Sequence, residues 1–188
     1  MNVSPCLTTD RLILRRWLPE DMEPFAQLNA DPEVMRFFPR RLTPGEVEAL
    51  VTRIETHFDH HGFGFWAVES RTTGELIGLT GLSIPSFAAP FMPTVEIGWR
   101  LARRFWGHGY ATEGAIAALR FGFENLDLPE IVAFTAQVNR RSIAVMERLG
   151  MKRYPDDDFD HPALPPGHPL QRHVLYRLTP VDFLAKGY

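Results

Sequence analysis

The chain contains a single cysteine, Cys6, among its 188 residues. One cysteine cannot form an internal disulfide or a cysteine-built zinc site, and it fits a reducing compartment. No run of 18 apolar residues occurs, and the first residues lack the charged, apolar and small-residue regions of a signal peptide. We therefore expect a cytoplasmic protein with no membrane partner.

The sequence also lacks any concentration of charge of one sign. Lys and Arg number 20 against 23 Asp and Glu, for a net charge of -3, and the basic residues are scattered along the chain. Nucleic-acid-binding proteins carry a basic patch or stripe, so we expect no nucleic-acid partner. The hydrophobic share of 45% is typical of a soluble globular protein, and the length suits one domain over residues 1–188.

Hydrophobic periodicity predicts a mixture of strands and helices. The expected strands are residues 11–17, 64–70, 75–84, 94–101, 130–138 and 173–178, and the expected helices follow Pro19 and cover 44–59, 110–125 and 141–149. A capping box at Thr43 and Glu46 starts the second helix, and Gly62 ends it. Hairpins followed by strand–helix alternation indicate an α/β (α+β) protein, with a mixed sheet flanked by helices. Residues 85–93 and 154–169, rich in proline, are expected to be surface loops.

The stretch RRFWGHGYATEG, Arg103 to Gly114, places two glycines where a strand runs into a helix. The first turn of a helix has free backbone N–H groups at the positive end of the helix dipole, which suits a phosphate. Without a Cβ atom, Gly107 and Gly109 allow an anion to approach the backbone. Arg103 and Arg104 can add charge-assisted hydrogen bonds to a pyrophosphate.

Two nucleotide-binding motifs fit this stretch poorly. A Walker loop requires Gly-x4-Gly-Lys-Ser/Thr, which is absent. A dinucleotide fingerprint requires a small third residue where Thr112 stands, and an acidic residue at the end of a second strand, whereas Asp127 and Glu130 precede one. A glycine-bearing turn without any ligand is the structural alternative.

The pattern Arg-x-x-Gly-x-Gly between a strand and a helix resembles the phosphate loop of the GCN5-related N-acetyltransferase (GNAT) superfamily. The segments VEIGWRLARRFWGHGYATEG and NRRSIAVMERLGM are similar to the RimJ/RimL-type branch. The resemblance extends over nearly the whole chain, apart from residues 85–93 and 155–169. It implies the GNAT fold, with a central, mostly antiparallel sheet of six to seven strands. It also implies acetyl-CoA as cosubstrate, no metal, an amine acceptor and, since family members often pair through sheet edges, a homodimer as one option.

The resemblance carries the site over residue by residue. The cofactor-binding set it implies is Trp99, Arg100, Leu101, Arg103, Arg104, Gly107, His108, Gly109, Tyr110, Ala111, Thr112, Asn139 and Ser142. Backbone amides at 99–101 would bind the pantetheine arm and polarise the acetyl carbonyl. Asn139 would bond the pantetheine amide, although asparagine is also a good helix N-cap.

Two residues are expected to take part in the chemistry. Glu96 shares a strand face with Gly98 and Arg100, so its carboxylate can accept the substrate proton, or bind the ammonium without acting as a base. Ser142 matches the serine near the coenzyme sulfur, and its plain alternative is an early-helix serine. Met146 stands where many family members have a tyrosine acid, which puts that mechanism in doubt; Tyr154 and Tyr176 are more typical of core-edge aromatics.

Other chemically notable residues favour structural interpretations. The histidines at 57, 60 and 61 lie near a helix end, where a charge–dipole role is favoured over metal binding. His161, His168 and His173 are treated as structural or loop residues. The run DDDFD at 156–160 is expected to be a solvated loop rather than a site that attracts a cationic amine.

These observations together predict an N-acetyltransferase that moves an acetyl group directly to a primary amine in a ternary complex. Protein N-terminal amines and small-molecule amines both stay open as acceptors. Cys6 precedes the first strand, away from the motifs, so no acetyl-cysteine intermediate is expected. The alternatives are a catalytically inactive CoA-binding sensor or scaffold and, from a third class, a nicotinamide-dependent oxidoreductase.

Overall fold

One mixed sheet organises the computed structural model, which describes residues 5–188. Within these residues nine strands follow the order β1-β2-β3-β4-β5-β6-β9-β7, with β8 attached to β9. The strands are β1 Leu7–Thr8, β2 Leu12–Arg15, β3 Phe65–Ser70, β4 Leu76–Ser83, β5 Glu96–Leu101, β6 Ile131–Ala136, β7 Lys152–Arg153, β8 Phe159–Asp160 and β9 Arg172–Leu178. Every neighbouring pair is antiparallel except β5–β6, which is parallel.

The fold class expected from the sequence is therefore confirmed, and the strand number is larger than expected. Three of the nine strands, β1, β7 and β8, have only two residues each. A two-residue strand shows no periodicity, and its pairing depends on neighbours that are distant in sequence. This explains why hydrophobic periodicity predicted only the six longer strands.

The helices begin and end close to the expected residues. They are α1 Met22–Ala30, α2 Pro44–His61, α3 Tyr110–Glu124, α4 Arg140–Arg148 and α5 Pro180–Ala185, with 3-10 turns η1 Pro19–Asp21, η2 Arg103–Phe105 and η3 Pro155–Asp157. The expected capping box is present, because the Glu46 N–H donates to the Thr43 side chain and the Glu46 side chain accepts from the Thr43 backbone. Gly62 follows α2 in the left-handed region, with φ of 78°.

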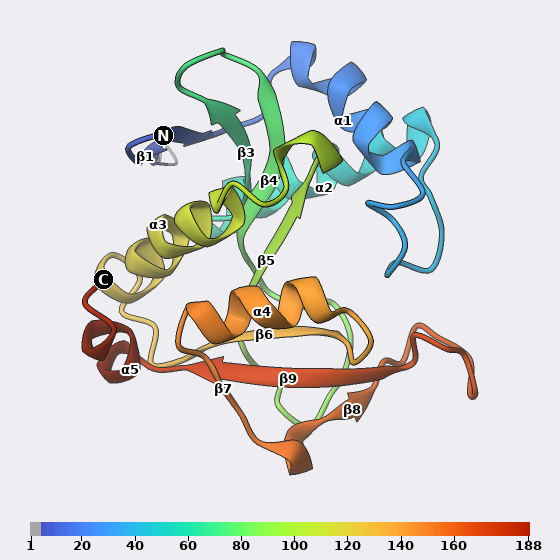
Figure 1. The fold of residues 1–188 in the computed structure, drawn as a ribbon, viewed down its shortest axis with the longest axis vertical. Coiled ribbons are helices and arrows are strands. Elements are labelled where there is room, and N and C mark those ends of the chain that lie inside the picture. The colour runs from blue at the N-terminus through green and yellow to red at the C-terminus, as the bar shows by residue number, and fades with distance from the viewer. Residues whose placement is uncertain (1–4) are drawn as a thin grey trace.

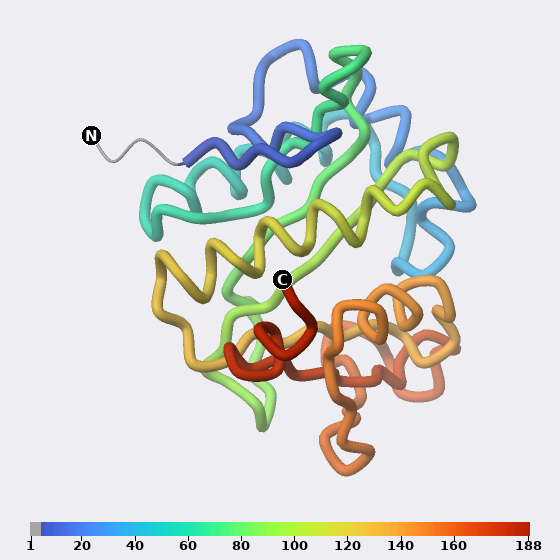
Figure 2. The backbone as a smooth tube through the Cα atoms, turned by 60° about the vertical axis from the view of Figure 1, so that its left-hand side comes forward, coloured from blue at the N-terminus to red at the C-terminus, as the bar shows by residue number. Residues whose placement is uncertain are grey.

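The helices cover the two faces of the sheet unequally. Figure 1 shows α3 and α4 in front of the sheet and α2 behind it, and Figure 2 shows α3 running along the strands from another side. The main hydrophobic core lies between these layers, with Trp66, Phe25 and Phe58 fully buried. Gly114 brings α3 close to β4, since a Cβ there would lie 2.9 Å from Thr80 Cγ2. The helix is thus fixed directly against the strand beside β5.

A second cluster covers the outer face of β6 and β9. Val132, Leu175 and Phe159 are buried there, packed against Phe87, Phe91 and Phe134. Phe87 and Phe91 come from the proline-broken segment, and Phe159 comes from the acidic, proline-rich segment. Both segments were expected to be surface loops, but each contributes aromatic side chains to this cluster, so neither lies wholly on the surface.

Candidate active site

The glycine-bearing loop joins β5 to α3 and ends in a helix without a side-chain cap. Gly107 and Gly109 both adopt the left-handed region, with φ of 81° and 82°. The first helical hydrogen bond runs from Glu113 N–H to Gly109 O. The N–H groups of Tyr110, Ala111 and Thr112 belong to the first turn, and no side chain caps this end of α3. Uncapped amides at a helix start can bind an anion, and their role in binding a phosphate stays a prediction.

Arg11, in the bend between β1 and β2, holds this loop through its side chain. Its Nη1 donates to His108 O at 3.0 Å, and its guanidinium lies 4.6 Å from the centroid of the Tyr110 ring. Its Nε donates to Glu113 Oε2 at 2.6 Å, while Thr9 Oγ1 donates to Glu113 Oε1 at 2.6 Å. These bonds lower the pKa of the Glu113 carboxyl even though desolvation raises it. No local pattern predicts this network, because Thr9 and Arg11 are about a hundred residues from His108 and Glu113.

Trp106 anchors the same loop to β5. The indole Nε1 donates to Leu101 O at 2.8 Å, and the Arg141 guanidinium lies 4.4 Å from the centroid of the indole ring. The start of α4 is therefore in contact with the loop before α3. Arg104, expected as a phosphate ligand, instead pairs with Glu75 across 3.3 Å and remains exposed.

The two strands that lead to this loop and to α4 separate after a single paired position. β5 pairs with β4 at six positions, from Gly78 opposite Leu101 to Ser83 opposite Glu96, but with β6 only at Glu96 opposite Val132. Val132 N–H donates to Val95 O at 3.0 Å, and no register pair joins β5 to β6 further along. Beyond Glu96, the side of β5 that faces β6 has no strand partner.

Backbone N–H and C=O groups alternate in direction along a strand, and this alternation shows which groups of β5 lack a strand partner. The register of the β4–β5 pair, continued by one residue, places Ala102 opposite Ile77, and Ala102 N–H donates to Ile77 O. In an antiparallel pair every second residue bonds the partner, so Arg100 bonds toward β4 while Trp99 and Leu101 point away from it. We call the N–H and C=O groups of Trp99 and the N–H group of Leu101 the open edge of β5, since Leu101 O already accepts from the Trp106 indole. The expectation for residues 99–101 is thereby refined, because the Arg100 backbone faces the other strand.

Glu96 stands where β5 and β6 separate. Its carboxylate makes no hydrogen bond or ion pair with any residue among 5–188, and the residue is partly exposed. Protein atoms nevertheless surround the group, and this desolvation raises the pKa of Glu96 to about 8. A carboxyl with such a pKa can exchange a proton near neutral pH.

Asn139 and Ser142 lie together at the start of α4. Ser142 N–H donates to Asn139 Oδ1 at 3.3 Å, so the asparagine is the N-cap of the helix. Asn139 Nδ2 donates to Thr135 Oγ1 at 2.9 Å, which holds the side chain at the end of β6. Met146 is 1% exposed and belongs to the core, so this position offers no proton donor.

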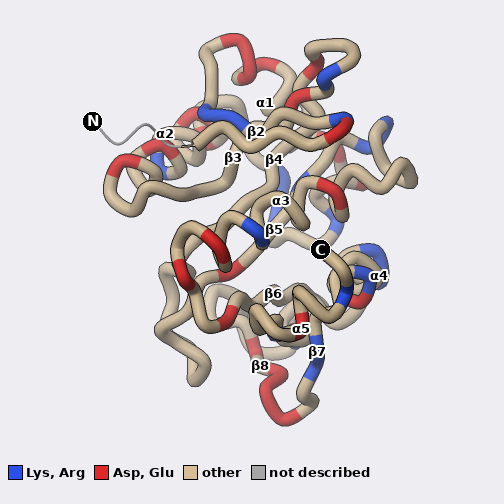
Figure 3. Tube along the Cα trace, turned by 90° about the vertical axis from the view of Figure 1, so that its left-hand side faces the viewer, with Lys and Arg blue, Asp and Glu red and all other residues tan. Residues whose placement is uncertain are grey.

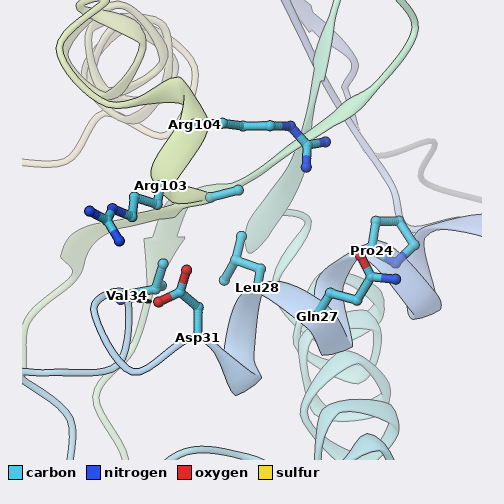
Figure 4. A pocket seen from close by; sticks show the side chains of 8 residues that line it. Pro24, Gln27, Leu28, Asp31, Val34, Arg103 and Arg104 are labelled. Carbon is cyan, nitrogen blue, oxygen red and sulfur yellow. Dashed lines mark hydrogen bonds between the residues drawn. The ribbon is translucent and has the colours of Figure 1, made fainter.

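Two cavities adjoin the loop and the helix start. One, of about 510 Å³, lies between α1 and the η2 turn and is lined by Pro24, Gln27, Leu28, Asp31, Val34, Ala102, Arg103 and Arg104. Figure 4 shows the two arginines leaving the turn in opposite directions, with Asp31 and Val34 near Arg103. The other, of about 400 Å³, is lined by Arg36, Phe37, Val138, Arg140, Arg141 and Leu170.

Comparison with known families shows to which family the chain belongs. A sequence model described as the acetyltransferase (GNAT) domain matches residues 11–152. The chain belongs to the GNAT acetyltransferase family. GNAT acetyltransferases use acetyl-CoA as cosubstrate, and this GNAT chain is an N-acetyltransferase, in line with relatives that carry that name.

Similar proteins agree with the family over most of the GNAT chain. The FsC-acetyl coenzyme A-N(2)-transacetylase of Aspergillus fumigatus is 31% identical over 98% of this chain and 80% of its own length. The Bacillus subtilis protein YkkB is 33% identical over 80% of this chain and 87% of its own. An acetyltransferase structure from Agrobacterium tumefaciens is 30% identical with a TM-score of 0.72, covering 93% of this chain and 94% of that one. The RimJ/RimL branch stays a prediction.

The histidines of α2 differ from the expectation. His57 Nδ1 lies 2.7 Å from Phe63 O, and Ile84 N–H donates to His57 Nε2 at 3.2 Å. A carbonyl can only accept and an N–H can only donate, so the ring is neutral with its proton on Nδ1. Burial lowers the pKa of His57 as well. The charge–dipole role expected for His57 is therefore wrong, because the neutral ring links α2 to the residue Phe63 before β3 and to Ile84 after β4. For His60 and His61 the role stays a prediction.

The acidic run DDDFD also differs from a solvated loop. Asp157 accepts from Arg177 Nε at 2.7 Å, and Asp158 pairs with Arg153 and accepts from Leu175 N–H. These carboxylates join the segment to β7 and β9, so they are not free to attract a cationic amine.

Residues 5–188 show neither a metal-holding cluster nor a membrane-spanning helix. No group of three or more His, Cys, Asp or Glu side chains in this part of the chain is arranged to hold a metal ion. None of the helices described here is long and apolar enough to cross a membrane.

Proposed function

We propose that this GNAT enzyme transfers the acetyl group of acetyl-CoA to a primary amine by direct attack in a ternary complex. The observation that supports the proposal most strongly is the open edge of β5, next to the uncapped start of α3. An unpaired strand edge inside a sheet leaves N–H and C=O groups without partners, which is costly unless a ligand or water supplies them. Acetyl-CoA has amides for such an edge and a pyrophosphate for the helix start.

The residues present fit this cosubstrate. The Trp99 N–H and C=O groups and the Leu101 N–H can bond the pantetheine amides, while the amides of Tyr110 to Thr112 can bond the pyrophosphate. His108 O is already occupied by Arg11, so the loop directs its carbonyl toward Arg11 rather than toward an anion. Bound acetyl-CoA supplies an activated thioester, and the chain supplies its position.

Glu96 is proposed to accept the proton of the incoming ammonium. The free pKa of an alkylamine is about 10, so a base is needed near neutral pH. With the pKa of Glu96 raised to about 8, the carboxyl is mostly protonated at pH 7 and becomes a base as the pH rises through 8. Activity should therefore increase over that range.

Ser142 is proposed to lie near the sulfur of the leaving thiolate and to donate a hydrogen bond to it. The residue is partly exposed in the first turn of α4, whose dipole favours a negative charge. The buried Met146 leaves no tyrosine at the position used by many relatives.

Thiol release measured against a panel of primary amines tests the proposal. The panel contains peptides with free N-termini and small amines, and a parallel thermal shift compares acetyl-CoA with NADH. We expect acetyl-CoA alone to raise the melting temperature, since a ligand that binds only the folded state stabilises it. Binding of acetyl-CoA without turnover of any amine, and with no difference for Glu96→Gln, would instead favour the sensor or scaffold alternative.

A further inference from the structure

The Arg100 side chain is held in a fixed position by neutral groups from α1 and the segment after it. Its Nη1 donates to Asn29 Oδ1 at 2.5 Å, and its guanidinium lies 4.0 Å from the centroid of the Phe38 ring. Asn29 is fully buried, and its Nδ2 donates to Phe25 O at 2.8 Å. This second bond orients the Asn29 carbonyl oxygen toward the arginine, so the cation is placed by a rigid support.

The position contains no counter-charge for this cation. None of the ion pairs within residues 5–188 includes Arg100, and its buried Nε has no hydrogen-bond partner. Burial lowers the pKa of Arg100 to about 10, with no carboxylate to oppose the change. A desolvated guanidinium without an anion is costly, and such a group is retained where a ligand supplies the anion.

Glu96 is on the same face of β5, four residues before Arg100. A strand rises about 3.3 Å per residue, so the two Cα atoms are about 13 Å apart. Burial alone accounts for both pKa shifts, and the two side chains form no ion pair with each other. The face toward α1 therefore carries one carboxyl and one guanidinium that do not neutralise each other.

We infer that Arg100 binds a carboxylate of the acceptor, whose amine end lies at Glu96. The inference rests on the function proposed above and names its acceptor class, an amine that also bears a carboxylate. The free Nε and Nη2 of the guanidinium form the fork that holds a carboxylate through two parallel bonds. At 3.3–3.6 Å per extended residue, a spacing of about 13 Å favours acceptors of two or three residues over a single α-amino acid.

The cavity beside α4, which Arg100 does not line, is also rich in positive charge. Three of its six lining residues are arginines, Arg36, Arg140 and Arg141, and the lining contains no acidic residue. None of the three takes part in an ion pair within the described residues. Figure 3 shows basic residues gathered on α4. A lining of one charge attracts anionic acceptors more strongly than neutral ones.

The inference is tested with pairs of acceptors that differ only at the carboxylate. The probes are alanyl-alanine, alanyl-alanyl-alanine and 5-aminovalerate, each compared with its own C-terminal amide at saturating acetyl-CoA. For wild type we expect kcat/KM for at least one carboxylate to exceed that for its amide by tenfold or more, mainly through KM. Arg100→Gln removes the guanidinium and its charge, and we expect the ratio to fall to within about twofold of one.

The controls separate this inference from the proposed function. Arg53→Gln removes an equal charge from the exposed face of α2 and should keep the wild-type ratio. A purely structural Arg100 would lower kcat/KM equally for each carboxylate and its amide, so an unchanged ratio in Arg100→Gln overturns the inference. Equal turnover of carboxylates and amides by wild type overturns it as well, with acetyl transfer intact. Binding of acetyl-CoA without turnover of any probe contradicts the proposed function and this inference together.

Discussion

The two sides of β5 differ sharply in how far they are paired with neighbouring strands. Toward β4 the strand has six register pairs, and toward β6 it has one. The paired side fixes the position of the strand, which allows the other side to remain without a strand partner. A central strand usually bonds on both sides, and under the proposed function the β6 side of β5 is kept for acetyl-CoA.

The largest expected effect comes from breaking the paired side. Gly78 in β4 has φ of 154°, and a Cβ there would lie 2.1 Å from Arg100 O. Gly78→Ala should lower the free energy of unfolding by about 3 kcal/mol or more, because the clash forces the strands apart. Urea titration measures this. Gly45→Ala, in a helix and with no atom near the added Cβ, should cost nothing.

The next effect concerns the chemistry at the point where the strands separate. Glu96→Gln should lower kcat by about 10² to 10⁴-fold if the carboxylate accepts the proton. The rise of kcat/KM through about pH 8 should disappear in the variant, while the rise near the pKa of the amine itself remains. A pH profile identical to that of wild type would show that Glu96 only binds the substrate.

A smaller effect separates the ligand role of the glycine loop from its backbone strain. Gly107 and Gly62 have φ of 81° and 78°, and neither has an atom within 4 Å of an added Cβ. Alanine at either position should cost about 1–2 kcal/mol of stability for the same reason. Only Gly107→Ala should also weaken acetyl-CoA binding, measured by calorimetry, since Gly62 lies at the end of α2. Equal affinities in the two variants would remove the loop from the site.

The smallest effect is a change in the pH dependence of stability. A carboxyl whose pKa is raised in the folded state binds more protons when folded, so its contribution to stability falls as the pH rises from about 4.5 to 8. Glu96→Gln should remove this loss, so at pH 8 its free energy of unfolding should exceed that of wild type by about 1–2 kcal/mol. The value is modest because Glu96 is partly exposed. Melting curves at pH 5 and pH 8 compare the two proteins, and a difference that is the same at both pH values would count against the raised pKa.

The features predicted correctly from the sequence are the caps and turns that a few adjacent residues determine. The capping box at Thr43, the helix end at Gly62 and the glycine turn before α3 each depend on a few adjacent residues, and each is present. The features that the sequence could not reveal depend on contacts between distant segments. The single β5–β6 pair, the neutral link at His57 and the support of Arg100 by Asn29 all belong to this second group.

The site shows the same division between local and distant determinants. Glu96 was proposed from its strand face, and Asn139 from its likeness to a family motif. The Asn139 N-cap follows from its place before a helix. The difference between Arg100 and its neighbours Trp99 and Leu101 required the pairing with β4, which no spacing in the sequence encodes.

Hydrogen exchange at the open edge of β5 tests the central claim most directly. The amide N–H groups of Trp99 and Leu101 would be compared, with and without acetyl-CoA, with that of Arg100, which faces β4. We predict strong protection of the first two amides and of Tyr110 to Thr112 when acetyl-CoA binds, and little change at Arg100. Binding of acetyl-CoA with no added protection at Trp99 and Leu101 would contradict the claim that the open edge holds the cosubstrate.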